Sequence, residues 1–320
     1  MISVAMAVYN GEKYLKDQLD SILNQTTPVD EIVIVDDKST DATTDIIREY
    51  QLKNPQIRLF LNDKNIGYRE NFRKAVSLCH GELTFLCDQD DRWDPKKVEI
   101  MSRIMENDKA IKVLASSFQF MDSSGSPYAV KLRRGMSNNN MYLKPVRVND
   151  LVPVSFEEFC SHNYFQGCSM AINLQIRNEF VENGSHSRLP HDWLIALIAS
   201  HKKGFYFLNQ PLFFYRIHAS NTIGVPKGQK KEEWVRLKFA EDMLDAARTA
   251  QALWPQEYGQ DLGMNHRIRF CIDHIDALKK RSFFKLLAQN LDPVYGELKS
   301  YRARAMDLLF AMTSKGTTDV

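Results

Sequence analysis

The sequence predicts an α/β fold in which helices flank a mostly parallel central sheet, followed by a helical appendage. Short apolar runs alternate with amphipathic segments over residues 1–115, the pattern of consecutive strand–helix–strand units. Polar clusters follow directly after several of these runs, where open α/β sheets bind their ligands. Beyond residue 225 the apolar spacing becomes helical. This change of pattern predicts two domains, at 1–224 and 225–320.

Apolar runs define the predicted strands of the first domain. They lie at residues 2–8, 31–35, 57–61, 83–87, 168–173, 204–209 and 212–218. Helices are expected around 14–23, 41–53, 69–79 and 193–200, and from Asp94 onwards. Thr40 or Asp41 can cap the second helix, whereas Asp94 and Pro95 suit the N-cap and the first helical position of the fourth. The polar, irregular segment 116–166 predicts loops over the sheet.

Composition restricts the class of protein. The formal net charge is +2, from 42 basic and 40 acidic residues mixed along the chain, so nucleic acid is not an expected partner. The five cysteines are odd in number and include no CxxC pair, which favours a reducing cytoplasm over a disulfide scaffold or a zinc ribbon. No apolar run approaches the ~20 residues that cross a bilayer, and the first residues do not read as a signal peptide. We therefore expect a cytoplasmic protein that is soluble or attached to a membrane surface.

Four polar clusters follow predicted strands of the first domain. They are Tyr9-Asn10, Asp36-Asp37, the segment 62–69 and the segment 88–91. Because the carboxyl ends of parallel strands meet at one edge of a sheet, all four clusters are expected to face the same crevice. Asp36-Asp37 follows a fully apolar strand, which favours a functional role over a simple turn.

The stretch "FLCDQDDRWDP" (85–95) places Asp88, Asp90 and Asp91 directly after a strand. A solvated acidic turn is one interpretation. A calcium-binding EF-hand loop is excluded, because Trp93 stands where that loop needs glycine and Arg92 where it needs a ligand. A divalent ion shared with phosphate oxygens is the other interpretation, since Mg²⁺ and Mn²⁺ favour such mixed coordination. The residues alone leave the turn and the ion site open.

Several motifs in order carry a resemblance to a known family. They are "VAMAVYNGEKYLKDQLDSILNQT", "IVIVDDKSTDAT", "NIGYREN", "FLCDQDDRWDPKKV", "PHDW" and "YRIHASN". As a set they resemble the family 2 glycosyltransferases, an inverting family with the Rossmann-like GT-A fold. "DQDDRW" and "YRIHASNTIG" are most similar to its rhamnosyltransferase-like branch. The resemblance covers residues 1–224 and leaves out the helical tail.

The resemblance implies a role for residues on the nucleotide side of the site. Ala7 and Tyr9 would line the nucleobase pocket, with Tyr9 as a stacking surface. Asp37 would accept a hydrogen bond from a pyrimidine ring. Arg69, within "NIGYREN", would lie near the base or the phosphates.

The resemblance also implies a metal site and a catalytic base. Asp88, Gln89 and Asp90 would form a DxD motif, in which Asp90 holds Mn²⁺ or Mg²⁺ and Asp88 contacts the ribose or the sugar. His218 would join the metal and the diphosphate.

Two further residues belong to this implied site. Arg216 would lie near His218 and the diphosphate. Asp192 of "PHDW" occupies the place of the catalytic base, although the residue alone could equally be the N-cap of the helix that follows.

The C-terminal tail predicts helices at 234–254, 264–279, 282–291 and 294–313, after a joint at 224–233. Its segment 279–287 ("KKRSFFKLL") combines four basic side chains with two phenylalanines and two leucines. Such a segment can lie on an anionic membrane, where lipid-linked acceptors are found. The alternative is a helix that packs on the first domain or on a second copy in a homodimer.

The leading functional prediction is an inverting, metal-dependent glycosyltransferase of cell-surface polysaccharide synthesis. Its donor would be dTDP-rhamnose or a UDP-sugar, and its acceptor a hydroxyl of a glycan or a lipid-linked molecule. A sugar-phosphate nucleotidyltransferase would need a glycine-rich, basic loop after the first strand, where "YNGEKY" stands. A catalytically silent glycan-binding or scaffold protein is the third alternative.

Overall fold

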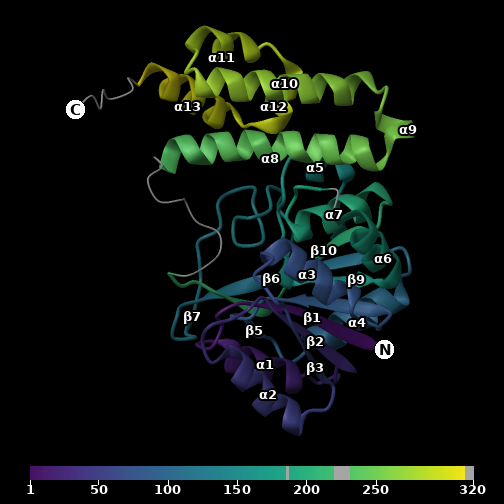
Figure 1. The fold of residues 1–320 in the computed structure, drawn as a ribbon. Coiled ribbons are helices and arrows are strands. Elements are labelled where there is room, and N and C mark those ends of the chain that lie inside the picture. The colour runs from purple at the N-terminus through teal and green to yellow at the C-terminus, as the bar shows by residue number, and fades with distance from the viewer. Residues whose placement is uncertain (185–186, 220–230, 314–320) are drawn as a thin grey trace, which may run out of the picture. The chain divides into compact units, whose positions relative to one another are not determined.

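The computed structural model describes residues 1–184, 187–219 and 231–313, which form two compact units (Figure 1). The sheet unit comprises residues 1–159, 163–186 and 190–221, and the helical unit comprises residues 160–162, 187–189 and 222–320. The predicted joint at 224–233 and the predicted division after residue 224 fall largely on residues 220–230, which lie outside the described residues.

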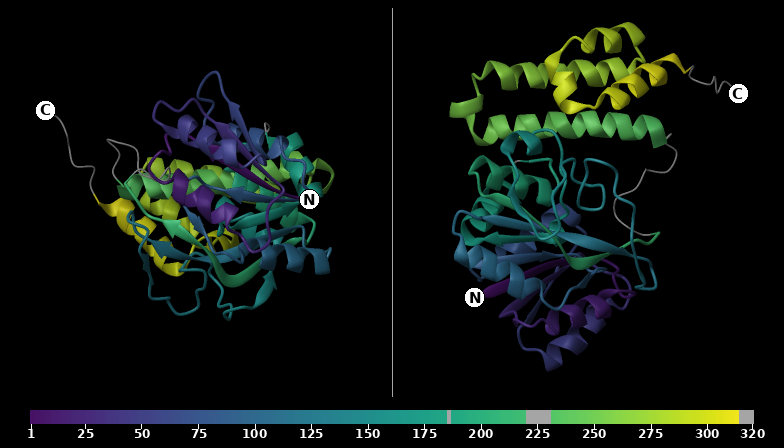
Figure 2. Two further views of the ribbon diagram at one scale, coloured as in Figure 1. Left: turned by 90° about the horizontal axis from the view of Figure 1, so that it is seen from below. Right: turned by 180° about the vertical axis from the view of Figure 1, so that it is seen from behind.

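Ten strands of the described residues form one mixed sheet, in the order β3-β2-β1-β4-β9-β6-β10-β5, with β7 beside β6 and β8 beside β10. Figure 2 shows the ribbon from two further sides. The strands are β1 (Ile2–Val8), β2 (Glu31–Asp36), β3 (Ile57–Leu61), β4 (Leu83–Cys87), β5 (Arg92–Trp93), β6 (Val113–Met121), β7 (Pro127–Tyr128), β8 (Leu151–Pro153), β9 (Met170–Asn173) and β10 (Phe205–Arg216). Strands β1 to β4 pair in parallel, as do β6 and β10, whereas β9 is antiparallel to both of its neighbours. The predicted α/β class is confirmed.

Helices cover both faces of the sheet. They are α1 (Leu15–Leu23), α2 (Thr43–Lys53), α3 (Tyr68–Ser77), α4 (Lys97–Asn107), α5 (Phe156–Phe159), α6 (Leu174–Asn183) and α7 (His191–His201), with a 3₁₀ turn, η1 (Gly167–Ser169). Alternate residues of β1, such as Val4 and Met6, share a core with Leu19 of α1 and Met101 of α4. The other face of β1 and β2 packs against α3. Burial on both faces explains why these strands are continuous apolar runs.

The segment 116–166 differs from its prediction as loops. Its first residues belong to β6, a nine-residue strand in the middle of the sheet. Ser116 and Ser117 interrupt the apolar run, yet both are buried. The sequence pattern therefore did not reveal that this segment is a core strand. The later residues include β7, β8 and α5.

Three other boundaries also differ. The strands predicted at 204–209 and 212–218 form one strand, β10, whose register shifts on either side of Pro211. Helix α6 was not predicted; Asn173 caps it by accepting a hydrogen bond from the backbone N–H of Ile176 (3.0 Å). Asp94 does not cap α4, because the following residues form a turn and the helix begins only at Lys97.

The helical unit contains α8 (Lys231–Leu253), α9 (Pro255–Tyr258), α10 (Leu262–Lys279), α11 (Phe283–Gln289), α12 (Pro293–Leu298) and α13 (Tyr301–Met312). The single helix predicted at 294–313 is therefore two helices. A buried ionic network joins them: Asp307 of α13 accepts from Lys299 Nζ (2.7 Å), Tyr295 Oη (2.7 Å) and Arg236 of α8 (2.5 Å). Lys299 Nζ also lies 3.0 Å from Nε2 of the buried His274. None of the described helices combines the length and apolarity that crossing a bilayer requires.

Candidate active site

Hydrogen bonds connect the loop after β4 to the end of β1. Gln89 Oε1 accepts a hydrogen bond from the backbone N–H of Tyr9 (2.8 Å), and its Nε2 donates to the carbonyl of Tyr9 (3.0 Å). A Cβ on Gly11 would lie 2.5 Å from Gln89 Oε1, so any larger residue at this position would displace the Gln89 side chain. The Tyr9 ring is 46% exposed and can act as a stacking surface, and Ala7 is half-buried at the end of β1. Gln89, predicted to bind the donor, thus has its amide engaged by Tyr9.

Asp37 organises the loop that leads into α3. Its carboxylate is 2% exposed and accepts hydrogen bonds from Asn62 Nδ2 (2.9 Å) and from the backbone N–H groups of Ile66 (2.8 Å) and Gly67 (2.8 Å). Both oxygens predicted to receive a nucleobase are therefore occupied by this loop. Arg69 is exposed in the first turn of α3, just beyond it.

Asp36 is the neighbouring carboxylate, to which the sequence analysis assigned no specific ligand contact. Its Oδ2 accepts from the backbone N–H of Ser39 (2.9 Å), whereas its buried Oδ1 has no hydrogen-bond partner among the described residues. A buried unpaired acceptor is costly, and a donor group of a ligand would satisfy it. The doubled aspartate after an apolar strand was the signal by which the sequence analysis expected a functional role for this pair.

The acidic loop, residues 88–91, concentrates negative charge at the end of β4. Burial and the charge of Asp90 raise the pKa of Asp88 to about 7. Burial and the charges of Asp90 and Asp88 raise the pKa of Asp91 well above its ordinary value. Carboxylate oxygens of Asp88 and Asp91 and the thiol of Cys168 lie within 4.8 Å of one another. A cation would relieve this repulsion by favouring the ionised carboxylates.

Asp90 faces the end of β10. Its Oδ2 lies 2.8 Å from Nε2 of His218, so the two residues predicted to bind a metal lie side by side. The ring of Tyr14 lies 4.7 Å from the His218 ring, measured between centroids.

Arg216 connects three segments beneath this pair. Its backbone N–H donates to Asp91 Oδ1 (3.0 Å), and its Nε donates to the backbone carbonyl of Asp90 (2.7 Å). Its guanidinium also pairs with Asp17 of α1 and lies over the ring of Tyr14, 4.7 Å from the centroid. The side chain is 3% exposed. Arg216, predicted to contact the donor, is therefore a buried link between β10, α1 and the acidic loop.

Asp192 lies at the start of α7, where Pro190 occupies the N-cap. Asp192 therefore does not cap the helix, and its Oδ1 accepts from the backbone N–H of Trp193 (2.8 Å). Its charge is among those that raise the pKa of Asp88. The two carboxylates, 104 positions apart in the sequence, are therefore near enough for the charge of one to affect the pKa of the other.

Lys97 is a site residue that the sequence analysis missed. It is fully buried on the inward face of α4, and its Nζ donates to the backbone carbonyl of Cys168 at 2.6 Å. Burial lowers the pKa of Lys97 to about 8, and the nearby thiols and carboxylates oppose this shift. Its spacing from Met101 and Met105, four and eight residues later on the same face, was the available signal.

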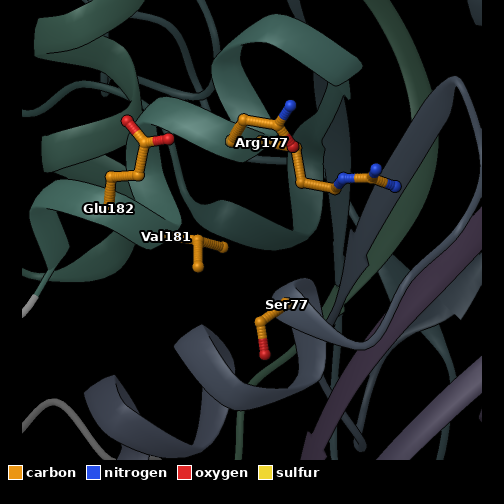
Figure 3. Close-up of a pocket in the computed structure, with 5 residues that line it drawn as sticks. Ser77, Arg177, Val181 and Glu182 are labelled. Carbon is orange, nitrogen blue, oxygen red and sulfur yellow. The ribbon is translucent and has the colours of Figure 1, made fainter.

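A pocket between α3 and α6 lies away from these residues. It is lined by Ser77, Arg177, Asn178, Val181 and Glu182 (Figure 3). Arg177 donates to the carbonyl of Gly81 (2.8 Å), shortly before β4 begins, so the pocket lies beside the amino end of that strand. It is therefore separate from the site at the carboxyl ends.

Known proteins resemble this chain in sequence and in fold. Residues 3–160 match the model of Glycosyl transferase family 2. An uncharacterized glycosyltransferase of Methanocaldococcus jannaschii, MJ1057, is 37% identical over 128 residues, which cover 39% of this chain and 44% of that protein. The putative teichuronic acid biosynthesis glycosyltransferase TuaG of Bacillus subtilis is 30% identical over 127 residues, which cover 40% of this chain and 50% of that one. The chain thus spans half or less of the length of these relatives.

Solved structures share the fold. S. aureus TarS 1-349 in complex with UDP-GlcNAc matches with a TM-score of 0.55 at 17% identity, over 94% of this chain and 91% of that one. GalNAc-T7 with UDP, GalNAc and Mn²⁺ matches with a TM-score of 0.54 at 14% identity, over 86% of this chain and 55% of that one. Identities this low indicate the fold alone. Taken together, the matches show that residues 3–160 are similar to Glycosyl transferase family 2 and that the fold is similar to that of GT-A glycosyltransferases.

Proposed function

We propose that the protein is an inverting, metal-dependent glycosyltransferase that moves a sugar from a nucleoside-diphosphate donor to a hydroxyl group. The observation that carries this proposal is the convergence of Asp88, Asp90, His218 and Asp192 at the carboxyl end of β4. The family 2 domain and the glycosyltransferases similar to this chain support it. TuaG, named for teichuronic acid synthesis, favours a role in polysaccharide synthesis.

The donor set fits a divalent ion of the Mn²⁺ or Mg²⁺ type. Asp90 and His218 offer a carboxylate and an imidazole side by side, and Asp88 adds a second carboxylate. Carboxylates suit hard cations, and imidazole is tolerated by Mn²⁺. A bound ion would neutralise the charge that develops on the leaving nucleoside diphosphate. The GalNAc-T7 structure with Mn²⁺ is consistent with this assignment.

Asp192 is the proposed general base. It takes the proton of the acceptor hydroxyl as that oxygen attacks C1 of the donor sugar and the bond from C1 to the diphosphate breaks. Attack from the face opposite the leaving group inverts the anomeric centre. General-base help of this kind contributes about 10²–10⁴-fold.

On the nucleotide side of the site, Tyr9 and Ala7 are the proposed contacts of the nucleobase. Asp36, Asp37 and Arg69 lie around them. Asp37 is the proposed acceptor for an N–H group of a pyrimidine, beside the hydrogen bonds that it accepts from the backbone N–H groups of Ile66 and Gly67. The motif resemblance favours dTDP-rhamnose, with UDP-sugars next; TarS with bound UDP-GlcNAc supports the latter.

The test is a transfer and hydrolysis screen of UDP-, dTDP- and GDP-sugars with and without Mn²⁺. D192N should bind the nucleotide normally but lose transfer by about 10²-fold or more. D90N should lose Mn²⁺-dependent nucleotide binding, whereas D45N, at an exposed aspartate of α2, should behave as wild type. Nucleotide binding without turnover would instead support a catalytically silent glycan-binding protein, and a D192N variant with full transfer would remove the base assignment.

We also propose that the helical unit reaches a lipid-linked acceptor by contact with an anionic membrane. Phe284 and Leu287 follow an i, i+3 spacing on α11 and are 81% and 46% exposed, and Leu291, shortly after the helix ends, is 89% exposed. Exposed Lys280 and Lys285 flank them, and their pairing with a surface aspartate is of a type that contributes little in water. Basic charge beside apolar groups suits an anionic lipid surface.

Vesicle flotation tests this contact. Binding to vesicles of phosphatidylglycerol and phosphatidylcholine, absent with phosphatidylcholine alone, is expected for the wild type and should be lost in the double variant F284S/L287S. Sedimentation of the full chain reports the alternative, a homodimer through the same face, which would appear as a dimer that the double variant converts to a monomer.

A further inference from the structure

We infer that Lys97 is a positioning residue that holds η1 between the acidic loop and the catalytic base. The inference rests on the proposed function and concerns how the two halves of the site are kept in register. It depends on contacts of Lys97, Cys168, Gly167 and His191, none of which the motif resemblance assigns.

Lys97 is buried with one hydrogen-bond acceptor and two aromatic rings close to its ammonium group. Its side chain is fully buried, and its only directional hydrogen bond within the described residues runs from Nζ to the carbonyl of Cys168. Nζ also lies 4.2 Å from the ring centroid of Trp93 and 4.7 Å from that of Phe213, as in cation–π contacts. Burying an ammonium group is costly unless its environment is pre-arranged. This environment presents one oxygen, and that oxygen belongs to η1.

On one side, η1 contacts the acidic loop. The thiol of Cys168 lies within 4.8 Å of the carboxylate oxygens of Asp88 and Asp91. The positive charge of Lys97 beneath this turn also counters the negative charge of the loop. Moving η1 would therefore disturb the carboxylates next to the proposed metal ligand.

On the other side, η1 contacts the start of α7. A Cβ on Gly167 would overlap Nε2 of His191, so the glycine backbone lies directly against this ring. The His191 ring stacks on Phe72 of α3, with centroids 3.9 Å apart at 15°. His191 immediately precedes Asp192. The position of η1 is therefore transmitted to the catalytic base through His191.

These contacts make η1 a spacer between the diphosphate side and the base side of the site. Rate depends steeply on such spacing, since a misplacement of about 1 Å can cost about 10²-fold. Loss of the Lys97 anchor should affect both sides, because the turn is then released. A methyl group on Gly167 should affect the base side alone, because it pushes on His191 and leaves Lys97 and Cys168 in place.

The experiment compares K97M, G167A and K96M in the full-length protein. K97M removes the charge at similar size, and K96M is the matched control at the exposed neighbouring lysine. Nucleoside diphosphate binding with Mn²⁺ is measured by calorimetry, transfer by steady-state kinetics, and local opening by hydrogen exchange of peptides covering residues 86–93 and 165–173. Thermal melts of each variant report the folded fraction.

We expect K97M to accelerate exchange in both peptides and to lower both nucleotide affinity and kcat by about tenfold or more, as expected for misplaced reacting groups. G167A should keep nucleotide affinity within about twofold but lower kcat by about tenfold. Rates and affinities that fall in both variants only in proportion to the folded fraction would overturn the inference. So would a folded K97M with wild-type exchange and kinetics.

The outcomes separate this inference from the proposed function. If the wild type shows no transfer activity, the proposed glycosyltransferase reaction is refuted. If K97M nevertheless exchanges faster at η1 and K96M does not, the role of Lys97 in holding η1 is still supported. If K97M does not fold, the split between affinity and kcat in G167A decides, and equal losses in both quantities would count against the spacer.

Discussion

Replacing Asp88 by asparagine should stabilise the metal-free protein while it removes the proposed activity. Burial and the charge of Asp90 raise the pKa of Asp88 from 3.8 to about 7. A rise of about three pKa units corresponds to about 4 kcal/mol of unfavourable interaction with the ionised form. Asparagine keeps the shape but not the charge, so we expect about half of this as a gain in the free energy of unfolding. For a unit of this size, a gain of about 2 kcal/mol raises Tm by roughly 4–8 °C.

The pH dependence of this gain has a definite sign. The folded pKa of Asp88 lies above the unfolded value, so its ionisation destabilises the folded state. The contribution is fully favourable below about pH 4 and is lost as the pH rises through about 7. The difference in Tm between D88N and wild type should therefore be small at about pH 4 and complete at about pH 8.

Thermal unfolding followed by circular dichroism, without divalent metal and over this pH range, is the assay. D63N is the control for removal of an exposed carboxylate. Added Mn²⁺ should stabilise wild type more at about pH 8 than at about pH 5, because the cation and protons compete for the same carboxylates. A D88N variant that is less stable than wild type at the higher pH, or a gap independent of pH, would refute the view that repulsion in the acidic loop limits stability.

Three further substitutions have defined outcomes. Glu31 is buried, which raises its pKa, but hydrogen bonds from His80 and other donors lower the pKa to about 2. E31Q should therefore lower the free energy of unfolding by roughly 2–3 kcal/mol at neutral pH. Chemical denaturation should show this loss disappearing as the pH falls from about 4.5 to 2. D307A leaves Lys299 buried without its carboxylate and should destabilise the helical unit by about 3–5 kcal/mol, seen as faster hydrogen exchange in α10 to α13. G11A should weaken nucleotide binding by about tenfold with a nearly unchanged Tm, because its Cβ displaces Gln89 from Tyr9.

Matched controls exist for these substitutions. E82Q changes an exposed glutamate near the start of β4, and D273A changes an exposed aspartate on α10. An E31Q variant whose loss persists at acidic pH, a D307A variant with wild-type exchange, or a G11A variant with unchanged nucleotide affinity would each contradict the corresponding structural reasoning.

Local signals were sufficient for most of the sheet unit. The runs at β1, β2 and β4 are apolar because both of their faces are covered, and this pattern can be recognised in the sequence without any partner. Strand β6 was not recognised as an apolar run, because Ser116 and Ser117 are buried polar residues in the middle of the sheet. The boundary of α4 shifted because a turn at Asp94 competes with the capping that its residue types favour.

Contacts between segments that are distant in the sequence determine which side chains of the site are already engaged within the protein. The sequence alone determined that acidic and aromatic residues would gather at the carboxyl ends of parallel strands, because strand direction follows from the βαβ pattern. It could not show that Asp37 accepts hydrogen bonds from the loop after β3, that Arg216 is buried against Asp17, or that Lys97 points inward. Those outcomes depend on which donors and acceptors meet once the chain has folded, and only the tertiary structure decides such pairings.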